Sequence, residues 1–133
     1  MYKIKVVSHF SAAHSLREYK GKCESLHGHN WKVEVVISAN KLNALGMVMD
    51  FNDLKRMTAQ VLEELDHTHL NELEYFSASG GKGNNPSSEQ IARYVFIRLK
   101  DEIVKQECKL EEVRVWETEN SCAVYLGTEE TNV

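Results

Sequence analysis

Two long stretches of alternating apolar and polar residues constrain the fold of this chain more than any other feature. They cover residues 2–12 and residues 28–39. The apolar residues of each stretch share one parity: Ile4, Val6 and Phe10 in the first, and Trp31, Val33, Val35 and Ile37 in the second. Because successive side chains of a strand point to opposite faces, the alternation predicts two strands, each with one face on a core.

Two helices are predicted in the middle of the chain. Asp50 or Asn52 can cap the first helix, whose apolar residues recur at intervals of three and four as far as Leu65. In the second helix, Ser87 and Gln90 stand at the spacing of a capping box. Both segments therefore carry start signals and one apolar stripe.

Two further strands are predicted near residues 110–118 and 122–127. The resulting order, ββααββ, indicates an α+β fold in which a four-stranded antiparallel sheet carries both helices on one face. A length of 133 residues gives room for one domain, which we assign to residues 1–133.

Charge and composition exclude several classes of protein. The formal net charge of −4 argues against a nucleic-acid-binding surface. No apolar run reaches the roughly 18–20 residues of a membrane span, and the first residues lack a signal-peptide core. Three scattered cysteines do not make a disulfide framework. We therefore expect a cytoplasmic protein with neither a nucleic-acid nor a membrane partner.

The triplet His27-Gly28-His29 is the strongest chemical signal in the sequence. Residues two apart in a strand face the same side with Cα atoms roughly 7 Å apart, so both rings can reach one metal ion at about 2.0–2.1 Å. The pair continues the parity of Trp31, and His14 shares the apolar parity of the first strand. Three neutral histidines would form a site with an open fourth position, as in catalytic zinc centres. The alternative is that these are ordinary core or surface histidines.

Cys23 lies four residues before His27, in the polar segment 15–26 that we predict to be a loop. Three interpretations remain open. Cys23 can be a fourth metal ligand that closes the site, a thiolate whose pKa is depressed by the metal and Lys22, or an ordinary exposed thiol.

Two carboxylates, Asp66 and Glu117, are not explained by the apolar and polar pattern of the predicted helices and strands. Asp66 precedes His67, which it can orient or make more basic, although the pair can equally mark the end of the first helix. Glu117 shares the parity of Val113 and Val115, so it points inward and needs a cationic or multi-donor partner, unless it lies in water at a sheet edge.

Six short motifs together resemble the 6-pyruvoyl-tetrahydropterin synthase and 6-carboxy-5,6,7,8-tetrahydropterin synthase family over nearly the whole chain. In chain order they are Phe10-Ser-Ala-Ala-His14, Cys23-x₃-His27-Gly-His29-Asn30, Met49-Asp50-Phe51, Leu65-Asp66-His67, Asn85-Pro86-Ser87-Ser88-Glu89 and Glu117-Thr118. The resemblance implies the T-fold (tunnelling fold), in which subunits join their sheets into a barrel. It also implies a homohexamer built as a dimer of trimers, with active sites between subunits.

The resemblance further implies a role for each candidate residue. It makes His14, His27 and His29 ligands of Zn²⁺, Cys23 the general base, Asp66 and His67 a proton relay, and Glu117 the anchor of a pterin ring. The implied substrate is 7,8-dihydroneopterin triphosphate, on whose side-chain hydroxyls zinc would act as a Lewis acid.

The spacing Cys23-x₃-His27 resembles the queuosine-pathway branch of the family. That branch releases acetaldehyde and triphosphate and leaves 6-carboxy-5,6,7,8-tetrahydropterin, whereas animal-type pyruvoyl synthases have a longer insertion here. Glu24 follows Cys23 directly, and some members use a glutamate in this region for aldolase-like cleavage, so both other activities remain alternatives. A non-catalytic, zinc-stabilised oligomeric module with a closed His₃Cys site is an alternative of another class.

Overall fold

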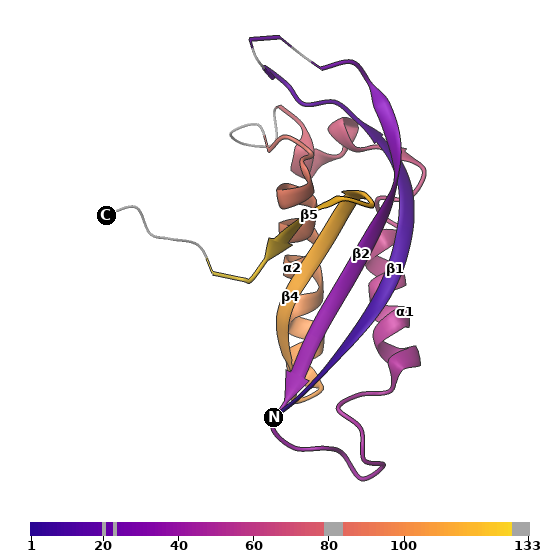
Figure 1. Cartoon of the computed structure of the whole chain (residues 1–133), viewed down its shortest axis with the longest axis vertical. Coiled ribbons are helices and arrows are strands. Elements are labelled where there is room, and N and C mark those ends of the chain that lie inside the picture. Colours follow the sequence, from indigo (N-terminus) through magenta and orange to yellow (C-terminus); the bar gives the residue numbers. More distant parts are fainter. Residues whose placement is uncertain (20, 23, 79–83, 129–133) are drawn as a thin grey trace, which may run out of the picture.

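One sheet and two helices make up most of the chain. The computed structural model describes residues 1–19, 21–22, 24–78 and 84–128 (Figure 1). The strands are β1 (Tyr2–His14), β2 (His27–Ala39), β3 (Thr68–His69), β4 (Lys109–Thr118) and β5 (Ser121–Tyr125). The helices are α1 (Phe51–Leu62) and α2 (Ser88–Lys105), and two 3₁₀ turns, η1 (Leu70–Glu72) and η2 (Glu74–Phe76), lie between them. The strand order across the sheet is β3-β1-β2-β4-β5.

The two strands predicted from alternation form the centre of the sheet. β1 and β2 are antiparallel and pair without interruption from Tyr2 opposite Ala39 to His14 opposite His27. β2 then pairs with β4, and β4 with β5, again antiparallel. The register places the start of β2 beside the end of β1, which brings histidines of both strands to one end of the sheet.

The sheet differs from the expectation by one short strand. β3 pairs in parallel with Ala12 and Ala13 of β1, so the described residues form five strands instead of four. A two-residue strand is too short to show a period, and for this reason the sequence pattern missed it.

Both helix starts carry the caps predicted for them. The Asp50 side chain accepts a hydrogen bond from the Asn52 N–H at 2.7 Å, and the Ser87 side chain accepts one from the Gln90 N–H at 3.2 Å. The end of α1 was predicted at Leu65, but the helix ends at Leu62. Leu65 nevertheless remains fully buried, because the turns after the helix continue its apolar contact with the core.

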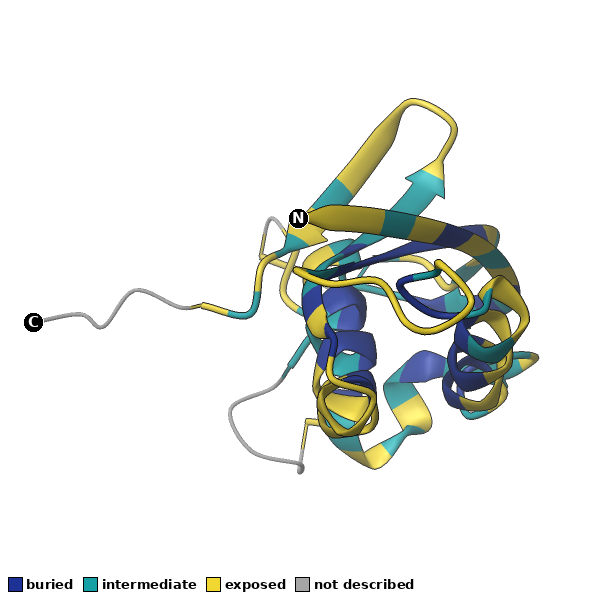
Figure 2. Ribbon diagram, turned by 90° about the horizontal axis from the view of Figure 1, so that it is seen from below, coloured by how far each residue is buried: buried dark blue, intermediate teal, exposed yellow. Residues whose placement is uncertain are grey.

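The core lies between the sheet and the helices. Both helices cover the same face of the sheet (Figures 1 and 2), with α1 against β1 and α2 against β4 and β5. The largest fully buried side chains come from both layers and include Trp31, Ile37, Leu54, Leu99 and Ile103. The opposite face carries charged pairs such as Lys5 with Glu34 and Glu34 with Arg114. In the part of the chain that the structure describes, neither helix has the length and apolarity needed to cross a membrane.

Candidate metal centre

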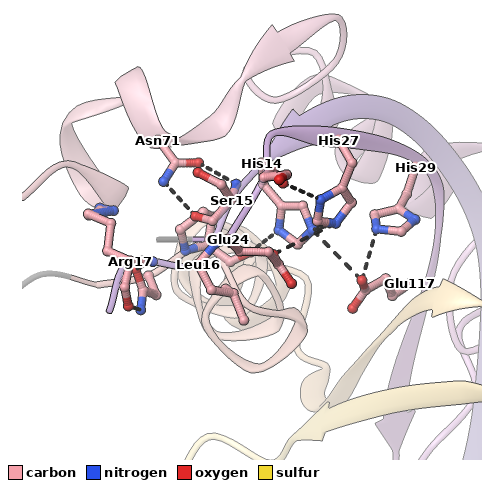
Figure 3. Close-up of polar contacts among 12 residues, drawn as sticks. His14, Ser15, Leu16, Arg17, Glu24, His27, His29, Asn71 and Glu117 are labelled. Carbon is pink, nitrogen blue, oxygen red and sulfur yellow. Dashed lines mark hydrogen bonds and ion pairs between the residues drawn. The ribbon is translucent and has the colours of Figure 1, made fainter. Parts of the chain in front are cut away.

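Three histidine rings meet at the end of the sheet that holds the last residue of β1 and the first residues of β2. His27 and His29 are two apart in β2 and face the same side, and His14 lies opposite His27 in register. Figure 3 shows the three rings grouped together. Their centroids lie 4.6–5.2 Å apart, and the Nε2 atoms of His14 and His27 are separated by 3.0 Å.

Backbone carbonyls fix which ring nitrogen carries the proton. The Nδ1 atom of His14 lies 2.7 Å from the Pro86 carbonyl oxygen, and the Nδ1 atom of His27 lies 2.8 Å from the Ser25 carbonyl oxygen. A carbonyl oxygen only accepts, so each Nδ1 must donate, and each neutral ring then holds a lone pair on Nε2. The two Nε2 lone pairs therefore face each other, an arrangement that a shared cation stabilises. Metal-binding histidines are commonly oriented by such bonds from the second ring nitrogen.

Burial favours the neutral form of His14. Removal from water lowers the pKa of His14 below its usual value, and the neighbouring His27 and His29 lower it further. The bond to the Pro86 carbonyl and the charge of Glu117 oppose this shift. A neutral ring is the form that binds a metal ion, so His14 needs little or no deprotonation near neutral pH.

Glu117 of β4 completes the group. Its Oε1 atom lies 2.8 Å from Nε2 of His29 and 3.7 Å from Nε2 of His14. The buried Nε2 of His29 makes no hydrogen bond despite this close approach. One ligand atom from each of the four residues lies within 4.8 Å of the others. The expected open fourth position is therefore faced by a carboxylate, because β4 is the neighbour of β2 and Glu117 shares its inner face.

The donor set suits zinc. Zn²⁺ in proteins is commonly bound by imidazole nitrogens and carboxylate oxygens, and catalytic sites often have three protein ligands and one open position. Two nitrogens at about 2.0–2.1 Å from a tetrahedral ion are about 3.3 Å apart. The observed separation of 3.0 Å between His14 and His27 is close to that value.

Asp66 and His67 form a separate pair, which is hydrogen-bonded to Ser11 of β1. The Asp66 Oδ2 atom lies 2.8 Å from Nδ1 of His67, and Oδ1 accepts the Ser11 N–H at 2.8 Å. The Ser11 N–H, and after it the His67 ring, hold the pKa of Asp66 below its usual value. The His67 N–H donates to the Ser11 carbonyl at 2.6 Å, and His67 has a φ of 57°. Its side chain is 81% exposed. The structure thus brings the two residues together but keeps them outside the four-residue metal group.

Cys23 lies outside the described residues. Its neighbour Glu24 is described: the Oε1 atom accepts the Leu16 N–H at 3.2 Å and lies 3.8 Å from Nε2 of His27. The chain on either side of Cys23 therefore belongs to the loop that joins two of the metal-group histidines.

Sequence reasoning missed the partner of Glu117. Arg114 points to the opposite face and pairs with Glu112 and Glu34, as its parity requires. Glu117 instead approaches Nε2 of His29 on the adjacent strand, and only the register of β2 against β4 reveals this proximity. The orienting carbonyls of Ser25 and Pro86 were also missed, since a backbone acceptor leaves no mark on residue type.

Comparison with known proteins identifies the family. The model of the family described as 6-pyruvoyl tetrahydropterin synthase matches residues 3–128. The chain belongs to this family. The match covers every residue of the metal group and the Asp66–His67 pair.

Curated relatives in the family are similar along most of their length. The chain is 38% identical to a 6-carboxy-5,6,7,8-tetrahydropterin synthase of Synechocystis sp., over 89% of this chain and 88% of the relative. It is 34% identical to the enzyme of the same name from Haemophilus influenzae, over 94% of this chain and 99% of the relative. It is also 33% identical to a dihydroneopterin monophosphate aldolase of Pyrococcus furiosus, over 81% and 82%.

A solved structure of the family has the same fold. The 6-pyruvoyl tetrahydropterin synthase of Caenorhabditis elegans superposes with a TM-score of 0.78 at 29% identity, and the match covers 96% of each chain. The T-fold expected from the sequence is thereby confirmed for this chain.

Proposed function

We propose that this protein is a zinc-dependent lyase of queuosine biosynthesis. It converts 7,8-dihydroneopterin triphosphate to 6-carboxy-5,6,7,8-tetrahydropterin and releases acetaldehyde and triphosphate. The observation that carries the proposal is the convergence of three imidazoles and one carboxylate at one end of the sheet. The names of the relatives from Synechocystis sp. and Haemophilus influenzae support this reaction over others of the family.

The metal group supplies binding and orientation. His14, His27 and His29 hold Zn²⁺, and the carbonyls of Pro86 and Ser25 keep two of these rings in the tautomer that can bind it. Bound there, the ion supplies Lewis acidity that acidifies the carbon protons beside the substrate hydroxyls. Trp31 packs edge-on against the rings of His14 and His29 and limits the directions in which they can turn.

Glu117 binds the pterin. Its side chain is 36% exposed, so a ligand can reach the carboxylate from solvent. A pterin presents adjacent N–H groups on one edge, and a carboxylate accepts two parallel hydrogen bonds from such an edge. This role uses the inward position of Glu117 and the small distance between the carboxylate and the metal group.

Proton transfer falls to the remaining candidates. Cys23 removes a proton from the substrate side chain, and His67, oriented by Asp66, returns one. Asp66 holds the Nδ1 side of the His67 ring, which leaves Nε2 directed away from Asp66. The high exposure of His67 fits a role toward substrate held by another subunit.

We also propose a cytoplasmic homohexamer, built as a dimer of trimers. β3 covers β1 only at Ala12 and Ala13, so residues 2–10 offer a strand edge to another copy, and β5 lies at the opposite edge of the sheet. The described cysteines, Cys108 and Cys122, are free thiols, which suits a reducing compartment.

An aldolase acting on a dihydroneopterin species is the second candidate. It is supported by the Pyrococcus furiosus relative and by Glu24, whose carboxylate lies 3.8 Å from Nε2 of His27. Synthesis of 6-pyruvoyl-tetrahydropterin, named in the family's description, is the third.

Product analysis separates these activities. The zinc-loaded protein is incubated with 7,8-dihydroneopterin triphosphate and the products are identified by mass. We expect 6-carboxy-5,6,7,8-tetrahydropterin and acetaldehyde in equal amounts. A 6-pyruvoyl product, cleavage to an aldehyde without the carboxylated pterin, or no conversion by metal-loaded protein would each contradict the proposal.

Replacement of Glu117 by Gln should weaken substrate binding far more than folding. The amide keeps the shape but loses the charge and one acceptor, and a hydrogen bond to a charged group contributes about 1.5–3 kcal/mol. We expect KM to rise roughly 10- to 100-fold with zinc still bound. Glu119→Gln, in the exposed β4–β5 turn, is the matched control. An unchanged KM with a large loss of stability would show that Glu117 is structural.

A further inference from the structure

Two of the three residues that follow His14 have their backbone groups bonded by side chains instead of by a neighbouring strand. The Asn71 amide accepts the Ser15 N–H at 2.9 Å and donates to the Ser15 carbonyl at 2.7 Å. The Asn85 amide treats Arg17 in the same way: it accepts the N–H at 2.9 Å and donates to the carbonyl at 3.0 Å. Each asparagine thus satisfies both backbone polar groups of one residue, as a paired strand would. Figure 3 shows the two bonds between Asn71 and Ser15.

The residue after Asn85 contacts the metal group. The next residue, Pro86, accepts the Nδ1–H of His14 through its carbonyl at 2.7 Å. The dipeptide Asn85-Pro86 therefore makes two sets of hydrogen bonds. One is to the side chain of His14 at the end of β1, and the other is to the backbone of Arg17 just after it.

The start of helix α2 holds the Asn85-Pro86 dipeptide in place. The Ser87 N–H donates to the Asn85 carbonyl at 2.8 Å, and Ser87 caps the helix that begins at Ser88. The Pro86 ring also restricts its own backbone torsion. The Pro86 carbonyl that orients His14 is thus held in place from two sides. Helix α2 holds the chain after it, and the bonds between the Asn85 amide and Arg17 hold the chain before it.

We propose that Asn85 is a positioning residue of the metal centre. Its amide holds the chain after β1 in register with Pro86, so that the His14 ring keeps its Nε2 lone pair directed toward His27 and His29. The inference rests on the metal binding that the proposed function assigns to these histidines.

The chemistry of the amide makes the proposal specific. Only a side chain that both donates and accepts can bind the two backbone groups of Arg17 at once. In Asn85→Asp the donor becomes an oxygen that faces the Arg17 carbonyl, and the resulting repulsion shifts the end of β1 relative to Pro86. The added negative charge by itself attracts a cation, so a weakened metal affinity would report position and not charge.

Metal binding by the purified full-length protein tests the proposal. Zinc affinity is measured by competition with a chromophoric chelator, and Co²⁺ replaces zinc to give a visible absorption spectrum that reports ligand geometry. We expect Asn85→Asp to bind zinc at least tenfold more weakly, with a changed Co²⁺ spectrum, since groups that orient metal ligands typically contribute 10- to 100-fold. Asn85→Gln, which keeps donor and acceptor, should recover part of the affinity.

Two controls isolate the effect. Asn84→Asp makes the same change one residue earlier, where the amide donates to the Tyr75 carbonyl at 3.2 Å, and it should bind zinc at least as tightly as the wild type. Ile103→Val creates a small defect in the distant core and reports how far a general loss of stability weakens the site.

The outcomes separate this inference from the proposed function. If the wild type does not bind zinc, the proposed function fails. If the wild type binds zinc and Asn85→Asp matches it, or if either control loses as much affinity as Asn85→Asp, only the positioning role is wrong. Should Asn85→Asp not fold, Asn85→Ala decides, because it removes both hydrogen bonds to Arg17 without adding a charge. Full wild-type zinc affinity and an unchanged Co²⁺ spectrum in Asn85→Ala would overturn the proposal.

Discussion

A His27→Ala variant is expected to lose both tight zinc binding and turnover, by about 10³-fold or more in kcat/KM. The Nε2 atom of His27 lies 3.0 Å from Nε2 of His14, and the Ser25 carbonyl orients the His27 ring through its Nδ1 atom. Lewis-acid stabilisation by a bound ion contributes several kcal/mol, which corresponds to a loss of that size. Metal content of the purified variant and steady-state kinetics are the measurements.

The fold of this variant should survive. The buried side chains of the sheet and the helices form a continuous core without any metal, so the melting temperature of the metal-free protein should change little. His9→Ala, on the exposed face of the same sheet, is the matched control and should keep both zinc and activity. If a chelator unfolds the wild type, or if His27→Ala cannot fold, zinc has a structural role. That result would favour the alternative of a non-catalytic, zinc-stabilised module.

A Cys23→Ala variant is expected to keep zinc and lose turnover by 10²- to 10⁴-fold, the usual contribution of a positioned general base. The thiol is absent while the three histidine ligands remain, so the metal content should stay at the wild-type level. Rates measured on zinc-loaded protein, together with metal analysis of the same sample, test this directly.

Two further variants make the result decisive. Cys122→Ala removes an exposed free thiol elsewhere and should be silent. Glu24→Gln changes the residue beside Cys23 that bonds the Leu16 N–H, and it should cost much less than Cys23→Ala if the thiolate is the base. Loss of zinc from Cys23→Ala would instead make Cys23 a ligand. A larger effect of Glu24→Gln would favour the aldolase.

Much of the fold could be predicted because its signals are local. The alternation around Trp31 and Phe10 identified β1 and β2 to within two residues of their ends. The caps at Asp50 and Ser87 were visible because a cap is a contact over two or three residues. The end of α1 was misplaced because an apolar pattern reports burial, which continues through Leu65 after the helical hydrogen bonds have stopped.

The site divides in the same way. His27 and His29 were expected to face the same side because they are two apart in one strand, and the inward direction of Glu117 also follows from parity. The contact between Glu117 and His29 depends on the register of two strands, which no local pattern contains. Asn85 bonds the backbone N–H and carbonyl of Arg17, which every residue type except proline offers, so the identity of residue 17 does not indicate this contact.

The backbone of His67 limits how this protein can be stabilised. A φ of 57° suits glycine, and a side chain bearing a Cβ in this region costs roughly 1–2 kcal/mol. The chain accepts that cost and ties the turn to Ser11 with two hydrogen bonds. Glycine here would relieve the torsion and raise thermal resistance, yet it would delete an imidazole at the rim of the sheet. Under the proton-transfer role proposed for His67, a screen that selects variants by heat resistance alone would therefore favour inactive enzyme at this position, so activity must be selected as well.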